Sequence, residues 1–181
     1  MPDQVSIYDK LKSFALHHCP VLTANKDDYL LRAGEVEQKI YFVASGAVMA
    51  GLVGEEEEHI IRFGYSGSII NSLASFYQQQ PSDMYLQAIR KTHYHSINQS
   101  DFRRIVGENE LSVQSYCQML EMLVVQQMER EVDLLVASPK DRIMRVMKRS
   151  PQLFQEVPHK YIAIYLRMTA ETFSRTLKSC V

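Results

Sequence analysis

Polar side chains recur on one face of a predicted helix near the C-terminal end of the chain. Thr169 is suited to capping this helix, and Phe173 and Leu177 share the face that we expect to turn inward. The outward face carries Ala170, Glu171, Ser174, Arg175 and Lys178. Arginine can donate two hydrogen bonds to guanine O6 and N7, and glutamate can accept one from cytosine N4. This face is therefore a candidate reader of base edges in DNA.

A second predicted helix precedes this one, and a tight turn at Arg167 and Met168 joins the two. Ile162 and Leu166 lie one turn apart on the first helix, and Ala163 is small enough to let the other helix cross closely. Residues 159–178 thus predict the helix-turn-helix that places its second helix in the major groove. Lys160 and Lys178 are candidates for phosphate contacts, and weaker candidates are Arg142, Arg145, Lys148 and Arg149.

Two observations weaken this interpretation. A capped surface helix with a Glu–Arg pair four residues apart is common without any DNA function. Arg167 stands where such turns usually have glycine, so it must take a left-handed backbone conformation at some cost.

A long helix is predicted before this pair, because residues 110–136 contain no glycine or proline. At 1.5 Å per residue it would extend roughly 40 Å, too far for a small β domain to cover its whole apolar stripe. We expect a second copy of the chain to pack along it as a two-stranded coiled coil. The alternative is a core helix of a single domain. The residues assigned to the dimer helix are Tyr116, Leu120, Leu123 and Gln127.

Short apolar runs separated by glycines fill residues 28–102. Runs of four to six residues at near-regular spacing predict a β-sandwich or jelly roll. The expected strands begin at Tyr29, Ile40, Ala47, His59, Tyr85 and Tyr94. The acidic run from Gly54 to His59 predicts an exposed hairpin tip, because adjacent carboxylates repel one another.

Three further segments complete the chain. Residues 5–18 predict a short amphipathic helix, and Ser138 with Pro139 predicts the start of another helix after the long one. Residues 150–158 are expected to be a connector that Leu153, Phe154 and Val157 pin to a small core. The fold class is α+β, with a β domain at 1–109, a dimerisation helix at 110–137 and a DNA-binding domain at 138–181.

The net charge changes sign at the boundary between residues 1–137 and residues 138–181. Residues 1–137 hold 11 Lys and Arg against 18 Asp and Glu, a net of −7, whereas residues 138–181 hold 9 against 3, a net of +6. An acidic body with a small basic head fits nucleic-acid binding by the head, although short segments also fluctuate by several charges. With 46% hydrophobic and 23% charged residues, the chain has an ordinary globular composition.

Other features exclude whole classes of site. Three cysteines far apart do not predict a disulfide framework or a four-thiolate metal centre. His17, His18 and Cys19 on one short helix cannot face one iron from two sides, and His93 and His95 offer only two imidazoles. We expect no metal and no cofactor. The N-terminus has no signal peptide and no run is long enough to span a membrane, so the expected location is the cytoplasm.

In this order of elements, the chain resembles the cyclic-AMP receptor protein and fumarate–nitrate regulator (Crp/Fnr) family, most of all its short Bacteroidetes-type members. The matching stretches are Leu31-Arg-Ala-Gly-Glu with Ile40-Tyr-Phe-Val-Ala-Ser-Gly, Ser138-Pro-Lys-Asp-Arg-Ile, and Tyr161-Ile-Ala-Ile-Tyr-Leu with Thr169-Ala-Glu-Thr-Phe-Ser-Arg. The resemblance implies a homodimeric transcription regulator with a cyclic-nucleotide-binding-like jelly roll (a double-stranded β-helix), a dimerising helix and a winged helix-turn-helix. It also implies that Glu171 and Arg175 read bases.

The sensor end departs from the family pattern. Members that bind cyclic nucleotide carry a Gly-Glu pair and, about ten residues later, Arg-Ser or Arg-Thr. This chain has Asn71 and Ser72 at the first place and Ser82 and Asp83 at the second. A carboxylate beside the cyclic phosphate would repel it, so cyclic AMP is not expected to be the effector. These four residues remain a candidate pocket for another small molecule.

The leading hypothesis is a homodimeric DNA-binding transcription regulator that is not regulated by cyclic AMP, with double-stranded DNA, a second copy and an unidentified small-molecule effector as partners. The alternative is a sensor or interaction module that has lost specific DNA binding. An enzyme has little support, because the chain has no glycine-rich phosphate loop, nucleophile elbow or metal-ligand spacing.

Overall fold

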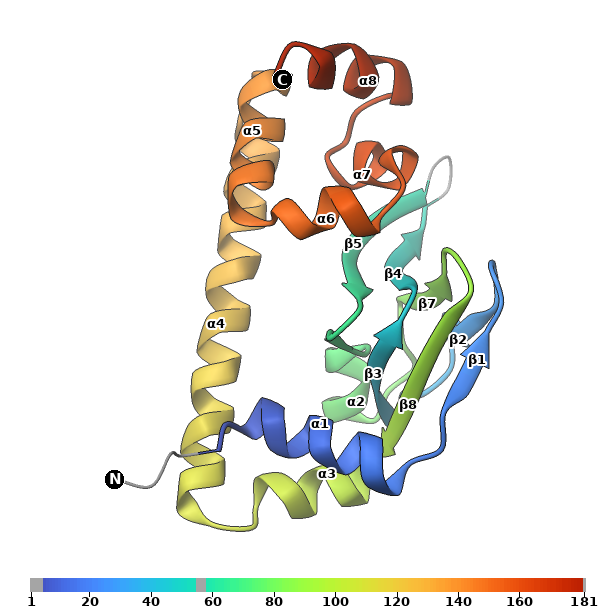
Figure 1. Ribbon diagram of the computed structural model, residues 1–181, viewed down its shortest axis with the longest axis vertical. Coiled ribbons are helices and arrows are strands. Elements are labelled where there is room, and N and C mark those ends of the chain that lie inside the picture. The colour runs from blue at the N-terminus through green and yellow to red at the C-terminus, as the bar shows by residue number, and fades with distance from the viewer. Residues whose placement is uncertain (1–4, 55–57, 181) are drawn as a thin grey trace.

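Two four-stranded antiparallel sheets form the N-terminal part of the chain, in a computed structural model that describes residues 5–54 and 58–180 (Figure 1). The first sheet has the order β1-β8-β3-β6 and the second β2-β7-β4-β5. The strands are β1 Leu22–Ala24, β2 Tyr29–Leu31, β3 Lys39–Ser45, β4 Ala47–Val53, β5 Glu58–Tyr65, β6 Ile69–Ile70, β7 Tyr85–Ala88 and β8 Thr92–Asn98. The predicted jelly roll is confirmed, and its eight strands include each of the six that the apolar runs predicted.

The longest apolar runs are strands buried on both faces. In β3, Tyr41 and Val43 point between the sheets, whereas Ile40 and Phe42 point outward beneath helices. In β4, Val48 and Ala50 point between the sheets, and the residues that alternate with them point toward the C-terminal helices. This arrangement explains why both strands lack the alternation of polar and apolar residues typical of half-exposed sheets.

A tight turn joins these two strands. Gly46 takes a φ of 96°, and a Cβ there would lie 2.6 Å from Thr92 Cα. Only glycine therefore fits at this turn.

Helices close the outer face of the first sheet. α1 (Ile7–His18) begins at the N-cap Ser6 and buries Ile7, Leu11 and Ala15, as its apolar spacing predicted. α3 (Gln99–Val106) packs beside it, and α2 (Leu73–Gln78) follows β6 and buries Phe76 against Phe102 of α3. The sequence reading did not predict α2 or α3.

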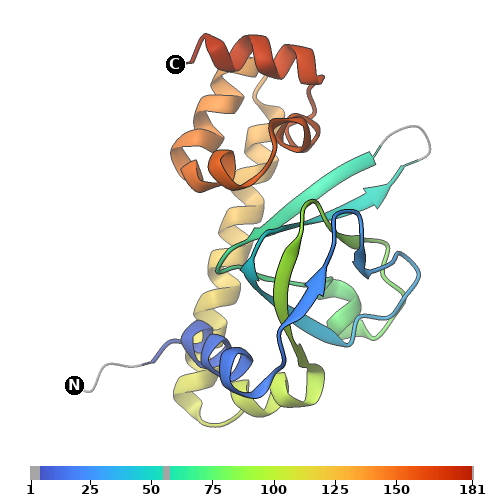
Figure 2. The same ribbon diagram turned by 45° about the vertical axis from the view of Figure 1, so that its right-hand side comes forward.

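The predicted long helix is confirmed as α4 (Glu110–Leu135), which runs along one edge of the molecule (Figures 1 and 2). It begins at the N-cap Asn109 and ends at Val136, next to the turn that the sequence Ala137-Ser-Pro indicated. None of the helices that the structure describes is long and apolar enough to cross a membrane.

Four helices form the C-terminal head: α5 (Pro139–Arg149), α6 (Pro151–Glu156), α7 (His159–Tyr165) and α8 (Ala170–Lys178). Ser138 caps α5 by accepting a hydrogen bond from the Asp141 amide, as predicted. Residues 150–158 connect α5 to α7, and Leu153, Phe154 and Val157 pin them to the core of the head, as predicted. The sequence did not predict that Pro151 starts a short helix there. The wing implied by the resemblance is also not found within residues 138–180, where every element is a helix.

The head packs on the outer face of the second sheet. One core contains Met49, Ile60 and Tyr85 from the strands and Ile162 and Phe173, among others, from the head. The two sheets are thus covered in the same manner, one by α1 and α3 and the other by the head. The predicted acidic hairpin tip falls on residues 55–57, outside the described residues.

Candidate nucleic-acid interface and effector region

The turn between α7 and α8 fixes the angle at which the two helices meet. The Met168 amide donates to the Ala163 carbonyl and the Arg167 amide to the Ile164 carbonyl, each at 2.9 Å. This is the bonding of a Schellman motif, which needs a left-handed residue directly after the helix. Arg167 takes that position with a φ of 53°, as the sequence predicted.

Arg167→Gly is expected to stabilise the protein by about 1 kcal/mol, because it removes the clash of a Cβ in the left-handed region. For a chain of this length that would raise Tm by about 2–4 °C in a thermal melt. Arg167→Ala is the matched control, since it removes the charge and keeps the Cβ. If alanine stabilised as much as glycine, the cause would be charge and not backbone conformation.

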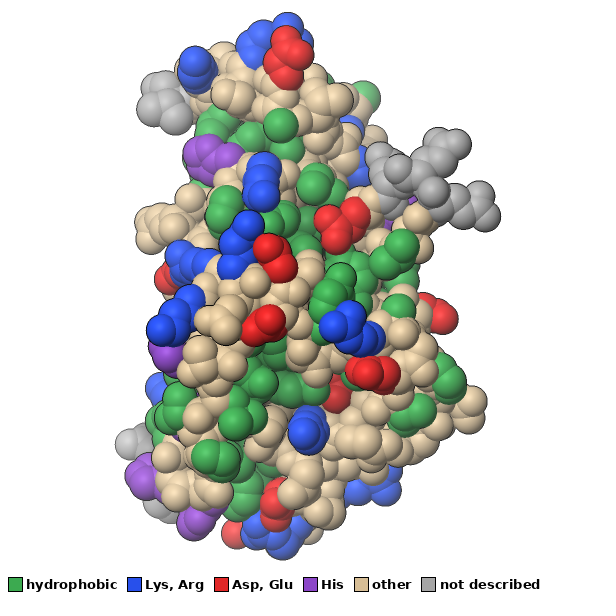
Figure 3. Space-filling view, turned by 90° about the vertical axis from the view of Figure 1, so that its right-hand side faces the viewer, with side chains coloured by type: hydrophobic (Ala, Val, Ile, Leu, Met, Phe, Trp, Pro, Cys, Tyr) green, Lys and Arg blue, Asp and Glu red, His purple; other side chains and the backbone are tan. Residues whose placement is uncertain are grey.

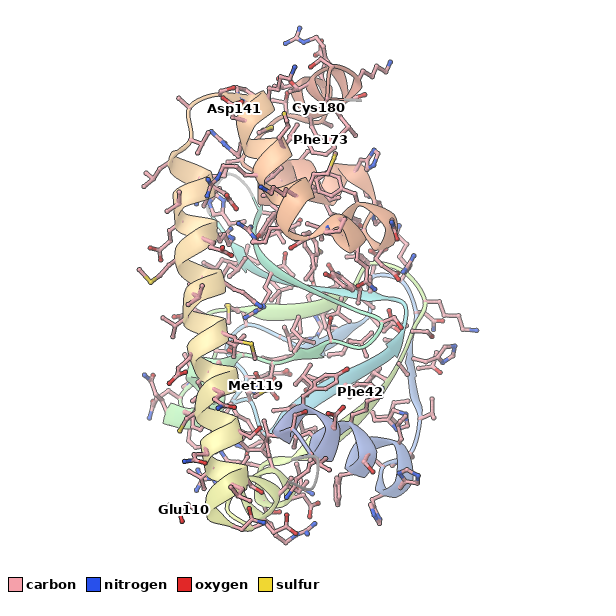
Figure 4. All side chains as sticks on the ribbon, turned by 60° about the vertical axis from the view of Figure 1, so that its left-hand side comes forward. Phe42, Glu110, Met119, Asp141, Phe173 and Cys180 are labelled. Carbon is pink, nitrogen blue, oxygen red and sulfur yellow. The ribbon has the colours of Figure 1, made fainter. Side chains whose placement is uncertain are left out.

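The second helix of the pair presents a free polar face. Thr169 caps α8 by accepting from the Thr172 amide at 3.1 Å, and Phe173 points into the head with 1% of its surface exposed (Figure 4). The outer face is exposed at Ala170, Glu171, Ser174, Arg175 and Lys178. Basic side chains lie at the same end of the molecule in the space-filling view (Figure 3). Both the capping and the orientation agree with the sequence prediction.

The other basic candidates divide into two groups. Lys160 is exposed at the start of α7, 4.5 Å above the Tyr161 ring, and Lys148 is exposed on α5. The arginines of α5 are engaged within the chain instead. Arg142 donates to the Val136 and Leu166 carbonyls, at 2.7 Å for the shortest contact to each.

Arg145 and Arg149 hold α5 against α4 through one carboxylate. Asp133 of α4 is 1% exposed and lies 2.9 Å from Arg145 Nε and 2.5 Å from an Arg149 amino nitrogen. A buried carboxylate needs such partners, because an unpaired charge there would be costly. These contacts hold α5 against α4. The Arg145 side chain is still 44% exposed and stays a candidate for a phosphate contact, whereas that of Arg149 is 22% exposed.

The predicted dimer-helix residues do not all lie on the free side of α4. The Tyr116 hydroxyl contacts that of Tyr77, its ring packs on Phe102, and Leu120 and Leu123 line a small cavity against their own β domain. Only Gln127 of the four is exposed. The exposed large apolar side chains of α4 lie further round the helix, on two strips. Val113, Val124, Met128 and Leu135 share one strip, which we call the outer row, and Leu111, Met122, Val125 and Val132 lie on the neighbouring one.

The predicted effector residues are partly brought together. Ser72 and Ser82 are buried, and their hydroxyl oxygens lie 2.8 Å apart. Asp83 is exposed, and Asn71 lines a cavity of about 110 Å³ between β6, α2 and α4. The Asn71 side-chain nitrogen is buried without a hydrogen-bond partner.

The buried carboxylate of Glu37 lies next to Ser72. Its carboxylate accepts from the Lys39 amide at 3.0 Å, the Tyr41 hydroxyl at 3.3 Å and the Ser72 amide at 3.4 Å. Burial raises the pKa of Glu37 above its ordinary value, and these hydrogen bonds offset part of that rise. Because the folded state has the higher pKa, this group stabilises the fold most at low pH and contributes less as the pH rises through the raised pKa.

Glu37→Gln removes this titration. The free energy of unfolding of the variant, relative to the parent, should therefore improve as the pH rises from about 4 to about 8. Urea unfolding at a series of pH values would measure it. Parallel pH profiles for parent and variant would contradict a raised pKa at Glu37.

A larger cavity, of about 530 Å³, lies where β5, α4 and the head meet. It is lined by the side chains of Arg62, Arg130 and Arg149 together with those of Phe63 and Tyr165. The sequence reading missed it, because these residues are far apart in the chain and form no local motif.

The histidines do not gather into a site. His93 contacts the Thr23 hydroxyl at 3.0 Å, and His95 is buried and contacts the Cys19 carbonyl at 2.9 Å. In the part of the chain that the structure describes, no three His, Cys, Asp or Glu residues are grouped as metal ligands.

Comparison with known proteins agrees with this geometry. Residues 21–109 match the family described as the cyclic nucleotide-binding domain. No curated protein sequence matches the chain.

Several solved structures share the fold. FixK2 from Bradyrhizobium japonicum is 17% identical, with a TM-score of 0.76 over 89% of this chain and 83% of its own. The c-di-GMP-responsive global regulator CLP from Xanthomonas campestris is 16% identical, with a TM-score of 0.66 over 94% and 89%. The Thermus thermophilus catabolite activator protein is 18% identical, with a TM-score of 0.56 over 94% and 82%.

Proposed function

We propose that the protein is a cytoplasmic transcription regulator that binds double-stranded DNA as a homodimer. The premise is that residues 21–109 match the cyclic nucleotide-binding domain and that the chain around them has the fold of the Crp/Fnr regulators. We propose also that cyclic AMP does not regulate the protein.

The observation that carries the proposal is the free outer face of α8. Its N-terminal end carries Glu171 and its middle Arg175, both exposed and both able to reach base edges. Lys178 and Lys160 flank them as phosphate contacts. The buried Phe173 and the Schellman turn set the position of α8 in the head, and its polar face points away from the head core.

The outer row supports a dimer. Val124 and Met128 lie four residues apart, and Leu135 follows seven residues later, which is the repeat of a two-stranded coiled coil. Val124, Met128 and Leu135 are 58%, 61% and 83% exposed, so the described part of the chain leaves these side chains largely uncovered. A second copy with the same row would cover them, and two α8 helices would then face successive major grooves of a two-fold site.

The residues at the positions where family members bind the cyclic nucleotide argue against cyclic AMP as the effector. The Ser72 and Ser82 hydroxyl groups are hydrogen-bonded to each other. The carboxylate of Asp83 would repel a cyclic phosphate bound beside it. In family members that bind cyclic nucleotide, the resemblance implies that the Glu of the Gly-Glu pair holds the ribose and that the Arg of the second motif neutralises the phosphate. This chain has Ser72 and Ser82 at these two positions.

Selection from random duplex DNA at about 150 mM salt tests the proposal, run with and without cyclic AMP. We expect enrichment of a palindromic motif that does not depend on cyclic AMP. Failure to enrich any motif, with binding that is weak and abolished by salt, would favour an interaction module without specific DNA binding.

Arg175→Ala is expected to weaken binding to that motif by about 1–3 kcal/mol and to relax base choice at one position. Fluorescence anisotropy with labelled duplexes would measure both effects. Arg103→Ala is the matched control, because it removes an exposed arginine on α3, at the other end of the molecule. Specific binding that survived Arg175→Ala undiminished would remove α8 as the reading element.

A further inference from the structure

The cavity of about 530 Å³ carries more positive charge than its neighbours neutralise. The guanidinium of Arg62 donates to the Gln126 side-chain oxygen at 2.7 Å, and that of Arg130 donates to the Ile60 carbonyl at 2.8 Å. Among the described residues, neither arginine has a carboxylate within ion-pair distance. Arg130 Nε is buried without any hydrogen-bond partner.

The positive charge of the third arginine, Arg149, is paired with carboxylates. Arg149 pairs with Asp133, and its Nε lies 3.6 Å from Glu129, a carboxylate that lines the cavity. Arg62 and Arg130 are therefore the two arginines of this cavity whose positive charge is not paired with a carboxylate among the described residues. Burial lowers the pKa of both, so each cation would gain from a negative partner.

Aromatic rings line the same space. The Tyr165 ring lies 4.8 Å from the Arg130 guanidinium and 5.5 Å from the Phe63 ring. Planar guanidinium groups match carboxylate and phosphate oxygens, and aromatic faces accept a flat apolar body. The volume also suits a small molecule, since ligand pockets usually measure about 300–1,000 Å³.

We propose that this cavity binds a small organic anion, with its phosphate or carboxylate on Arg62 and Arg130 and a ring against Tyr165 and Phe63. The site is separate from the region of Ser72 and Ser82. It is also on the side of α4 that faces its own β-sandwich, so the outer row can be covered while it is occupied.

A ligand here would touch all three parts of the chain: β5 of the sandwich, α4, and the head through Tyr165. It would therefore favour the docked position of the head over any other. This regulatory consequence rests on the proposed function, whereas binding itself does not.

Titration calorimetry with the full chain tests the site without DNA. Phenyl phosphate and benzoate are the probes, which distinguish a phosphate site from a carboxylate site, and benzyl alcohol is the neutral control. We expect saturable binding of at least one anion with a Kd of about 1 mM or below, and none of benzyl alcohol. Saturation by neither anion would overturn the proposal and leave the DNA-binding proposal standing.

Substitutions in the cavity test whether the anion binds there. Arg62→Met and Arg130→Met should each weaken the anion about tenfold or more, whereas Arg103→Met, the same change on exposed α3, should not. If Arg130→Met fails to fold, Arg62→Met still tests the site, because the Arg62 side chain donates its hydrogen bond to the exposed Gln126 and not to the backbone. Binding unchanged in both cavity variants would contradict the assignment. Loss of DNA affinity with anion binding intact would instead make these arginines DNA contacts.

Discussion

Val124→Glu combined with Met128→Glu is expected to leave the chain folded but monomeric, with its affinity for a two-fold DNA site lowered about a hundredfold or more. Both side chains are more than half exposed on α4, so the fold of one copy does not depend on them. In a coiled coil each would face its counterpart, and glutamates there would be desolvated beside like charges. A monomer also loses the gain from engaging two half-sites at once, which is worth about 10²–10⁴-fold.

Analytical ultracentrifugation would measure the assembly, and anisotropy with full and half sites would measure the DNA affinity. The matched control is Gln118→Glu combined with Met122→Glu. It adds the same charges four residues apart, on an exposed strip about a third of a turn round the helix. A dimer that survived the first double variant and was lost in the control would place the interface on the other strip.

Phe173→Ala is expected to lower the free energy of unfolding by about 3–5 kcal/mol. Phe173 is buried between Phe154, whose ring stacks on it at 6.4 Å, and His159, whose ring meets it at 5.6 Å. Alanine would leave a cavity directly beneath the outer face of α8. DNA binding should therefore fall with stability, although Phe173 itself faces away from any duplex.

Urea unfolding followed by circular dichroism would measure this loss. Phe173→Leu keeps most of the volume and should cost clearly less, with α8 still in place. A loss below about 1 kcal/mol for the alanine variant would mean that the head core does not position α8.

Much of the head could be predicted because its signals are local. Ser138 and Thr169 each accept a hydrogen bond from the amide three residues later, so each cap is defined within four consecutive residues. The left-handed conformation of Arg167 was also predicted from a local signal, because Arg167 stands where the turn of a helix-turn-helix usually has glycine. Phe173 followed from helical spacing alone.

The elements that were missed depend on tertiary contacts. Helix α2 has six residues and is stabilised by burying Phe76 against Phe102, a partner 26 positions away. Short helices of this kind are marginal without such packing. Helix α3 did leave a local signal, because Asn98 caps it by accepting from the Asp101 amide.

The face of α4 could be predicted only in part. Its apolar residues surround more than half of the helix, so spacing alone does not say which of them the β-sandwich covers. Leu123 was placed at the dimer seam, and the structure places it in a cavity of its own subunit. The cavity of about 530 Å³ could not be predicted from the sequence, because Arg62, Arg130 and Arg149 come together only when the head packs against the β-sandwich.

The head and the β-sandwich share one core, in which Met49 and Ile60 of the sheet pack with Ile162 and Leu166 of the head. Two units built in this way denature together, so a single melting transition is the natural outcome. The same sharing constrains evolution and engineering. A head grafted from a relative would meet an outer sheet surface shaped for a different partner, so the core residues of the head and the outward-facing residues of β4 and β5 have to change as a set.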